Sequence, residues 1–201
     1  MSRRIITIGR QYGSNGRRIA KKLSEKLGIH YYDKELIKLA SEQNDISYDE
    51  LVKVDEKRAN PWRYPVEDPT QMESRFRFDP MNDVLFYTQA QIITRLADTE
   101  DCIIVGRCAN DILKSRPTSR SIFIHAPLDY RLQTVMERTS LEEKEALSLI
   151  KKVDKQRKFY YNYYTDKKWE EMSQYDLCLD SSAMSEDEIL NVLTALYESI
   201  L

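Results

Sequence analysis

Short runs of apolar residues alternate along the chain with longer segments in which apolar residues recur three or four positions apart. The short runs are continuous and mostly β-branched, which is typical of strands buried on both faces of a parallel sheet. They cover residues 5–8, 29–32, 102–105, 121–126 and 176–180. The amphipathic segments predict helices over about 16–27, 34–41, 82–98, 128–138, 141–158 and 185–201. This alternation predicts an α/β fold with a five-stranded parallel sheet flanked by helices.

Three features mark helix boundaries. Gly28 follows the first amphipathic segment and is expected to end that helix. Ser140, with Glu143 three residues later, predicts a capping box for the helix over 141–158. Ser185 and the acidic residues after it are expected to cap the last helix.

Three of the five glycines lie within eight residues, at positions 9, 13 and 16, between the first strand and the first helix. A glycine turn at such a junction points backbone N–H groups and the positive end of a helix dipole at one spot. This favours an anion site, most often for phosphate, over a tight turn without function. The expected cradle consists of Gly13, Ser14, Asn15, Gly16, Arg17 and Arg18. The loop lacks the lysine and the Ser/Thr of the standard phosphate-loop pattern.

Charged residues directly follow two other predicted strands. Ligands of parallel sheets bind at the carboxyl ends of the strands, where Asp33 and Arg107 are expected. A carboxylate and an arginine beside a phosphate loop suit phosphoryl transfer, which depends mainly on positioning and charge neutralisation. The alternatives are that Asp33 caps the following helix and that Arg107 pairs with a nearby carboxylate.

Two further segments combine cations with aromatic residues. Residues 55–80 contain four of the six prolines, which predicts little regular structure. The arginines of this segment could hold a phosphate and its aromatic residues could stack on a base; surface packing, for example at a homodimer contact, is an equally good interpretation. Residues 151–168 contain seven lysines and arginines but two acids. They fit a solvated helix face, a single-stranded nucleic-acid patch or a lid closing over phosphates.

Composition limits the class of protein. The chain of 201 residues fits one domain, and its net charge of -2 gives no reason to expect nucleic-acid or membrane partners. Its three cysteines lie far apart, which favours a reducing compartment. The first residues lead directly into a strand, and no apolar run reaches membrane-spanning length. A cytoplasmic protein is therefore expected.

Several motifs occur in one order along the chain. They are Gly-Ser-Asn-Gly-Arg from Gly13, His-Tyr-Tyr-Asp from His30, Gly-Arg at Gly106, Ile-Phe-Ile from Ile122 followed by Arg131, and Leu-Asp-Ser-Ser from Leu179. In these motifs the sequence resembles the cytidylate kinases, within the P-loop nucleoside monophosphate kinases. It resembles the cytidylate kinase-like branch more closely.

The resemblance implies a fold, an activity and site residues. The fold would be a single P-loop kinase-like domain over 1–201, with a core of about 1–40 and 100–201. A helical acceptor-binding insertion would cover about 41–98, and a lid about 139–170. The activity would be ATP-dependent phosphoryl transfer, with Mg²⁺, to a small nucleotide acceptor such as CMP or dCMP. The implied site residues are Arg17 or Arg18 on the donor phosphates, Asp33 on acceptor or metal, Arg107 and Arg131 on phosphates, and Arg157 in the lid.

The phosphate loop departs from the family pattern. An ungapped alignment places Gly16 at the lysine and Arg17 at the Ser/Thr that binds Mg²⁺. A shift of one residue places Arg17 at the lysine and Arg18 at the Ser/Thr. Neither alignment supplies a hydroxyl, so the metal ligands stay unassigned: the metal site is either rebuilt, for example with Asp33, or absent. A catalytically weakened nucleotide sensor and a kinase of a non-nucleotide metabolite are therefore alternatives.

Overall fold

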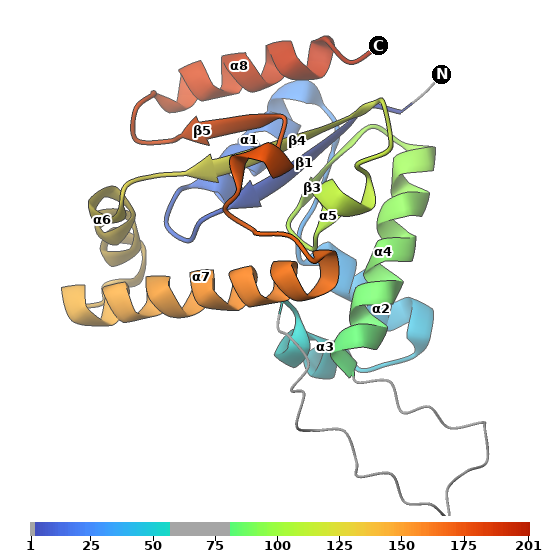
Figure 1. The fold of residues 1–201 in the computed structure, drawn as a ribbon, viewed down its shortest axis with the longest axis horizontal. Helices are drawn as coiled ribbons and strands as arrows, with labels where there is room; N and C mark the ends of the chain where they lie inside the picture. Colours follow the sequence, from blue (N-terminus) through green and yellow to red (C-terminus); the bar gives the residue numbers. More distant parts are fainter. Residues whose placement is uncertain (1–2, 57–80) are drawn as a thin grey trace, which may run out of the picture.

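The computed structural model describes residues 3–56 and 81–201, which form one parallel sheet covered by helices (Figure 1). The strands follow the order β2-β3-β1-β4-β5, and all neighbours pair in parallel. Their bounds are β1 Ile5–Arg10, β2 His30–Tyr32, β3 Cys102–Val105, β4 Ser119–His125 and β5 Leu177–Asp180. The five predicted strands are confirmed.

Helices connect the strands and follow the predicted pattern closely. Their bounds are α1 Gly16–Leu27, α2 Glu35–Asn44, α3 Tyr48–Val54, α4 Met81–Thr99, α5 Ala109–Ile112, α6 Leu128–Thr139, α7 Glu143–Thr165 and α8 Glu186–Glu198, with a 3₁₀ helix, η3, at Met172–Gln174. The short helices α3 and α5 were not predicted. Helix α7 continues seven residues beyond the predicted end at 158.

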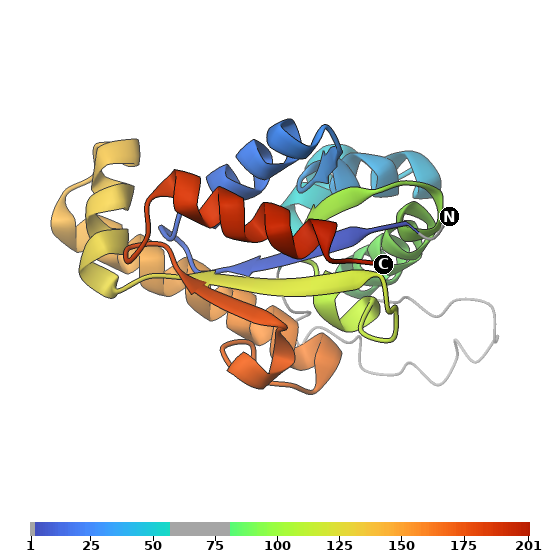
Figure 2. The ribbon, with the colours of Figure 1, turned by 90° about the horizontal axis from the view of Figure 1, so that it is seen from above.

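The sheet buries a different set of side chains on each face. Ile6 and Ile8 of β1 pack with α1 and α8, which lie together against one face (Figure 2). Ile5 points to the other face and packs with apolar residues of α2, α3, α4 and α5. This alternation is the two-residue period of a strand. Because helices cover both faces of the sheet, the strands appear in the sequence as continuous apolar runs.

Two of the three helix-boundary predictions are confirmed. Gly28 ends α1 in the left-handed conformation, with φ 65°. Ser185 and Glu188 form a reciprocal capping box at α8. The capping box expected at Ser140 is wrong: Ser140 has φ 56° and ends α6, while Glu142 is the N-cap of α7. Since α6 extends to Thr139, Ser140 forms the left-handed turn that ends one helix and cannot cap the next.

The predictions for 55–80 fall mostly outside the described residues, which include only Asp55 and Glu56 of that segment. The division into core, insertion and lid stays a prediction. Over the described ranges, none of the helices has both the length and the apolar character needed to cross a membrane.

Candidate active site

The loop between β1 and α1 takes its shape from left-handed residues. Gly13 has φ 84°, and a Cβ there would lie 2.8 Å from the carbonyl oxygen of Arg131, so the position requires glycine. Asn15, the N-cap of α1, has φ 59°. Because α1 begins at Gly16, its first N–H groups and the positive end of its dipole are directed at this loop. The local geometry is that of an anion-binding loop.

The side chain of Ser14 serves the structure of the loop itself. Ser14 is fully buried, and its hydroxyl lies 2.9 Å from the carbonyl oxygen of Gln11 and 3.0 Å from that of Ile124. The hydroxyl of Ser181, after β5, donates to the carbonyl oxygen of Ser14 at 2.8 Å. The loop is therefore tied to β4 and to the end of β5 by hydrogen bonds within the protein.

A cavity of about 310 Å³ lies in front of this loop. Its walls include Gly16 at the start of α1, Asp33 after β2, Arg107 after β3 and Arg157 of α7. These residues come from distant parts of the sequence and meet because parallel strands end at the same edge of the sheet. The predicted candidates Arg17, Asp33, Arg107 and Arg157 all line this one cavity.

Arg107 stands between two carboxylates. Its Nη1 lies 2.6 Å from Oδ1 of Asp33, and its Nη2 lies 2.7 Å from Oδ2 of Asp55. Nη1 also donates to the carbonyl oxygen of Val105 at 3.0 Å. Arg107 is 2% exposed and Asp33 is 5% exposed, so this is a buried ionic cluster. A buried arginine with fixed donors is well suited to bind a carboxylate or a phosphate.

The two arginines at the start of α1 point in different directions. Arg17 reaches Asp33, with Nε 2.6 Å from Oδ2, and its side chain is 58% exposed. Tyr31 donates from its hydroxyl to the same carboxylate oxygen at 3.3 Å. The hydrogen bond with Tyr31 and the charge of Asp33 raise the pKa of Arg17 above its usual value. Arg18 instead pairs with Glu186 of α8 at 2.7 Å, so the structure does not bring it into the Asp33 cluster.

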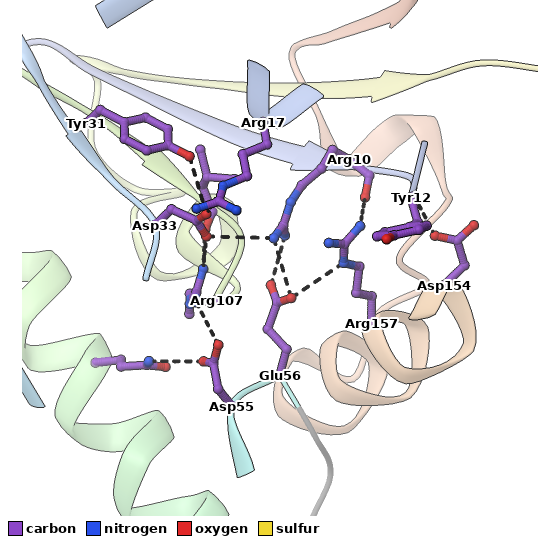
Figure 3. A network of polar contacts seen from close by, with 12 residues as sticks. Arg10, Tyr12, Arg17, Tyr31, Asp33, Asp55, Glu56, Arg107, Asp154 and Arg157 are labelled. Atoms are coloured by element: carbon purple, nitrogen blue, oxygen red, sulfur yellow. Dashed lines mark hydrogen bonds and ion pairs between the residues drawn. The ribbon is translucent and has the colours of Figure 1, made fainter. Parts of the chain in front are cut away.

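A second set of contacts centres on Glu56, at the end of the described part after α3 (Figure 3). Arg10, the last residue of β1, donates from Nη1 to Oε1 of Glu56 at 2.8 Å. Arg157 places its Nε 3.4 Å from Oε2 of the same carboxylate and donates from Nη1 to the carbonyl oxygen of Arg10 at 3.1 Å. The Nη2 of Arg10 lies 3.9 Å from Asp33, which links the two sets.

The charges of this network determine its protonation. Burial alone would raise the pKa of Asp33, but the charges of Arg107, Arg10 and Arg17 lower it below the usual value. Burial likewise works against ionised Glu56, yet Arg10, Arg157 and Arg107 lower its pKa well below the usual range. Burial and the nearby charge of Arg10 lower the pKa of Arg157 to about 10. At neutral pH, the carboxylates of Asp33 and Glu56 and the guanidinium of Arg157 are charged.

Arg131 has a different position from the other candidates. Its Nη1 lies 2.5 Å from Oδ2 of Asp154 on α7 and donates to the carbonyl oxygen of Tyr12 at 3.3 Å. Its Nε donates to the carbonyl oxygen of Ala126 at 3.0 Å. Asp154 also accepts from the backbone N–H of Tyr12 at 2.7 Å. Arg131 therefore joins the glycine loop, the segment after β4 and α7.

The structure resolves the two alternatives for the strand-end residues in different ways. Asp33 does not cap α2, because the N-cap is Lys34 and the Asp33 carboxylate faces three arginines. Arg107 does pair with neighbouring carboxylates, as its alternative proposed. That pairing also brings it to the cavity, so it is compatible with a ligand-binding role.

Sequence reasoning missed Arg10, Asp55 and Glu56. For Arg10 a signal existed, since it directly follows an apolar run, but the strand was predicted to end at Ile8 and in fact includes Arg10. Asp55 and Glu56 carried no such signal. They follow α3, a helix that the sequence pattern did not predict, and nothing in their local sequence relates them to Arg10 or Arg107.

Together, the β2-β3-β1-β4-β5 sheet and the glycine loop between β1 and α1 define a P-loop fold of the nucleoside monophosphate kinase type. The profile of the cytidylate kinase-like family matches residues 5–183. The chain belongs to this family.

Known proteins of similar sequence or structure agree with this placement. A cytidylate kinase of Methanopyrus kandleri is 27% identical over 206 residues, covering 98% of this chain and 94% of that protein. The crystal structure of an uncharacterised protein from Eubacterium ventriosum has a TM-score of 0.74 and 30% identity, covering 98% and 99% of the two chains. The shikimate kinase of Bacteroides thetaiotaomicron has a TM-score of 0.57 at 12% identity, covering 97% and 98%, and shares the fold. The family supports phosphoryl transfer as the class of chemistry.

Proposed function

We propose that the protein transfers a phosphoryl group from ATP, with Mg²⁺, to a nucleoside monophosphate, and that CMP or dCMP is the acceptor. One observation carries this proposal: a preformed phosphate loop, a buried carboxylate and buried arginines line a single cavity. The name of the relative from Methanopyrus kandleri supports cytidylate as the acceptor.

The loop suits the phosphates of the donor. Gly13 and the start of α1 offer backbone N–H groups and the positive end of a helix dipole. Arg17, exposed at the edge of the cavity, would neutralise part of the phosphate charge. Preformed donors of this kind stabilise the charge that develops during transfer.

Mg²⁺ would enter with the nucleotide. The described residues contain no cluster of three or more His, Cys, Asp or Glu side chains that could hold a metal by themselves. Mg²⁺ is commonly bound by substrate phosphates and one or two carboxylates, and Asp33, a carboxylate of the cavity wall that contacts Arg17 of α1, would serve. To serve as a ligand, Asp33 would exchange Arg17, its most exposed partner, for the ion. The metal would supply charge neutralisation at the phosphates.

The arginines beyond the loop suit the acceptor phosphate. Arg107 is buried, stays protonated and has its guanidinium fixed by Asp33 and Asp55. Arg157 reaches the same cavity from α7, within the predicted lid. Asp33 would orient the acceptor by keeping Arg107 in place. The predicted insertion over about 41–98 would bind the remainder of the acceptor.

A panel assay tests the proposal. The full chain is mixed with ATP, Mg²⁺ and one of CMP, dCMP, UMP, dTMP, AMP or GMP, and ADP formation is measured. We expect turnover with CMP or dCMP, and a loss of about 100-fold in kcat/KM for R107M. R95M, which removes an exposed arginine of α4, is the matched control and should behave as wild type. Binding of ATP without turnover of any monophosphate would refute the nucleotide-kinase proposal.

A nucleotide sensor is the second candidate, favoured by the missing loop hydroxyl and by the pairing of Asp33 with arginines rather than with an open metal position. Metal dependence separates the two. A sensor would bind ATP equally well with or without Mg²⁺, whereas the kinase requires the metal to neutralise charge. The same assay, with ATP as donor, can also be run with hydroxylated or phosphorylated metabolites as acceptors. Turnover of one of these but of no nucleotide acceptor would identify a non-nucleotide kinase.

A further inference from the structure

The phosphate loop has no side chain at the position where its helix begins. The ungapped alignment places Gly16 at the lysine of standard phosphate loops, whose ammonium reaches the terminal phosphates. Here the helix begins at Gly16 itself. Gly16 is not in the left-handed region, so backbone conformation does not explain why a glycine occupies it.

The reason for this glycine is the side chain of Arg10. A Cβ on Gly16 would lie 2.7 Å from Cβ and 3.3 Å from Cγ of Arg10. The stem of Arg10 therefore runs across the face of the helix from which a lysine would project. Any residue larger than glycine would displace it. Gly16 and Arg10 are thus complementary: one lacks a side chain where the other fills the space.

The guanidinium of Arg10 ends inside the cavity. A Cβ on Gly106 would contact its Nη1, which shows that the group lies against the end of β3. From there it contacts Glu56 and approaches Asp33 (Figure 3). Arg10 is 7% exposed, and its buried Nε has no hydrogen-bond partner in the described residues. A donor is therefore still available in a site rich in positive charge.

The two arginines that directly follow Gly16 are less suited to this position. Arg17 is 58% exposed and is held at Asp33, and Arg18 is held at Glu186 on α8.

Glu56, whose carboxylate accepts from Arg10, has φ 50°, a conformation that is costly for a residue other than glycine. An anion from the segment after α3 thus already occupies the guanidinium of Arg10.

We infer that Arg10 replaces the missing phosphate-loop lysine and binds the terminal phosphates of the nucleotide, exchanging the carboxylate of Glu56 for a phosphate oxygen. The cation reaches the phosphates from the end of β1 instead of from the first turn of α1. This inference rests on the proposed function for its catalytic part, whereas its binding part needs only that the loop binds ATP.

Nucleotide binding by calorimetry tests the binding part. The probes are the non-hydrolysable analogue β,γ-imido-ATP and ADP, each with Mg²⁺, on the full chain. We expect R10M to weaken the triphosphate by at least tenfold more than the diphosphate, and R10K to retain part of the difference. R17M should weaken both to a similar degree, and R95M neither. If R10M leaves the ratio of the two affinities within twofold of wild type, the inference is wrong.

Moving the positive charge from position 10 to position 16 distinguishes a loss of phosphate binding from a loss of folding. The variant R10G/G16K moves the cation to the standard loop position and removes the side chain that would collide with it. We expect the double variant to recover triphosphate affinity that R10G lacks, while G16K alone binds poorly because Arg10 still occupies the space. Equal affinities for R10G and R10G/G16K would contradict the inference. Thermal unfolding of each variant identifies those that fail to fold, and these are excluded from the binding comparison. R10M/E56Q, which removes one positive and one negative charge, is the charge-balanced variant.

The catalytic part has a separate outcome. With an active acceptor, R10M should lower kcat by about 100-fold, the typical cost of removing one transition-state donor. If R10M keeps the wild-type kcat, Arg10 is not the lysine replacement. If wild type turns over no acceptor yet R10M still loses its preference for triphosphate, the proposed function is wrong and the binding role of Arg10 stands.

Discussion

Asp33 and Arg107 form a buried ion pair that joins the carboxyl ends of β2 and β3, with Oδ1 and Nη1 2.6 Å apart. The two residues are 74 positions apart in sequence. Their strands are neighbours in the sheet, with Tyr32 opposite Ile104, so the residues that follow each strand meet beside the phosphate loop. The pair joins two strand ends and fixes the direction of one guanidinium, so the same group would serve both the fold and the proposed binding of phosphate.

Replacing Asp33 with asparagine should affect stability and activity together. D33N leaves Arg107 with Asp55 but deprives Arg17 of its partner, and breaking a buried pair on one side costs about 3 kcal/mol. We expect that decrease in the free energy of unfolding, measured with urea, and, because Arg107 loses part of its positioning, a fall in kcat of about 100-fold.

The matched control for this variant is D98N. Asp98 also pairs with an arginine, Arg116, but its side chain is 61% exposed, and such pairs contribute less than about 1 kcal/mol. A D33N protein as stable as D98N would show that the Asp33 pair contributes nothing beyond a surface contact.

Glu56 should make the protein sensitive to acid. Its pKa in the folded state lies below the ordinary value of about 4.5, so its ionised form stabilises the fold above that pH. This contribution is lost as the pH falls from about 4.5 towards the pKa of Glu56 in the folded protein. In that range Glu56 binds a proton in the unfolded chain but stays ionised in the folded one, so the proton favours unfolding. E56Q should therefore be less stable at pH 7 and lose less stability between pH 5 and 3, as measured by urea unfolding at each pH.

The same variant should bind anions more tightly. E56Q removes the carboxylate that occupies Arg10 and Arg157, so ATP affinity should rise by about tenfold. The control is E42Q, at an exposed acid of α2. Unchanged ATP affinity in E56Q would indicate that Glu56 does not compete with the nucleotide.

Two glycines allow conformation and contact to be separated. Gly13 and Gly28 both have positive φ, but a Cβ on Gly28 meets nothing within 4 Å, whereas one on Gly13 meets Arg131 at 2.8 Å. G28A should cost about 1–2 kcal/mol for its conformation alone and leave ATP binding unchanged. G13A should cost more and also abolish ATP binding, because Arg131 and the loop must separate. Equal losses of stability in the two variants would argue against this contact.

Arg131 and Asp154 should show strong energetic coupling. Both contact Tyr12, and they lie 2.5 Å apart, so the loop, α6 and α7 depend on one small cluster. A double-mutant cycle with R131M and D154N, measured by thermal and urea unfolding, should give a coupling of about 1–3 kcal/mol. Additive effects within about 0.5 kcal/mol would show that the pair does not hold the loop to α7.

Much of the fold could be predicted because its signals are local. Continuous apolar runs identified all five strands, and their separation by amphipathic segments identified a parallel sheet. Local signals failed where a residue fitted two positions. Ser140 has a side chain typical of a helix N-cap, but because α6 extends to Thr139, Ser140 is the C-cap of α6. Helix α3 was missed because its seven residues bury only Leu51 completely, which leaves too little periodicity to recognise.

The sequence by itself determined the glycine loop before the first helix and the places of Asp33 and Arg107 directly after their strands, because glycine spacing and apolar runs are properties of neighbouring residues. Only the tertiary structure decided which cation stands beside the loop. The stem of Arg10 fills the space that Gly16 leaves, and its guanidinium meets Glu56, 46 positions away. Such a pairing depends on how side chains from separate elements share volume and charge. No local pattern contains that information, because it arises only when the sheet brings the strand ends together.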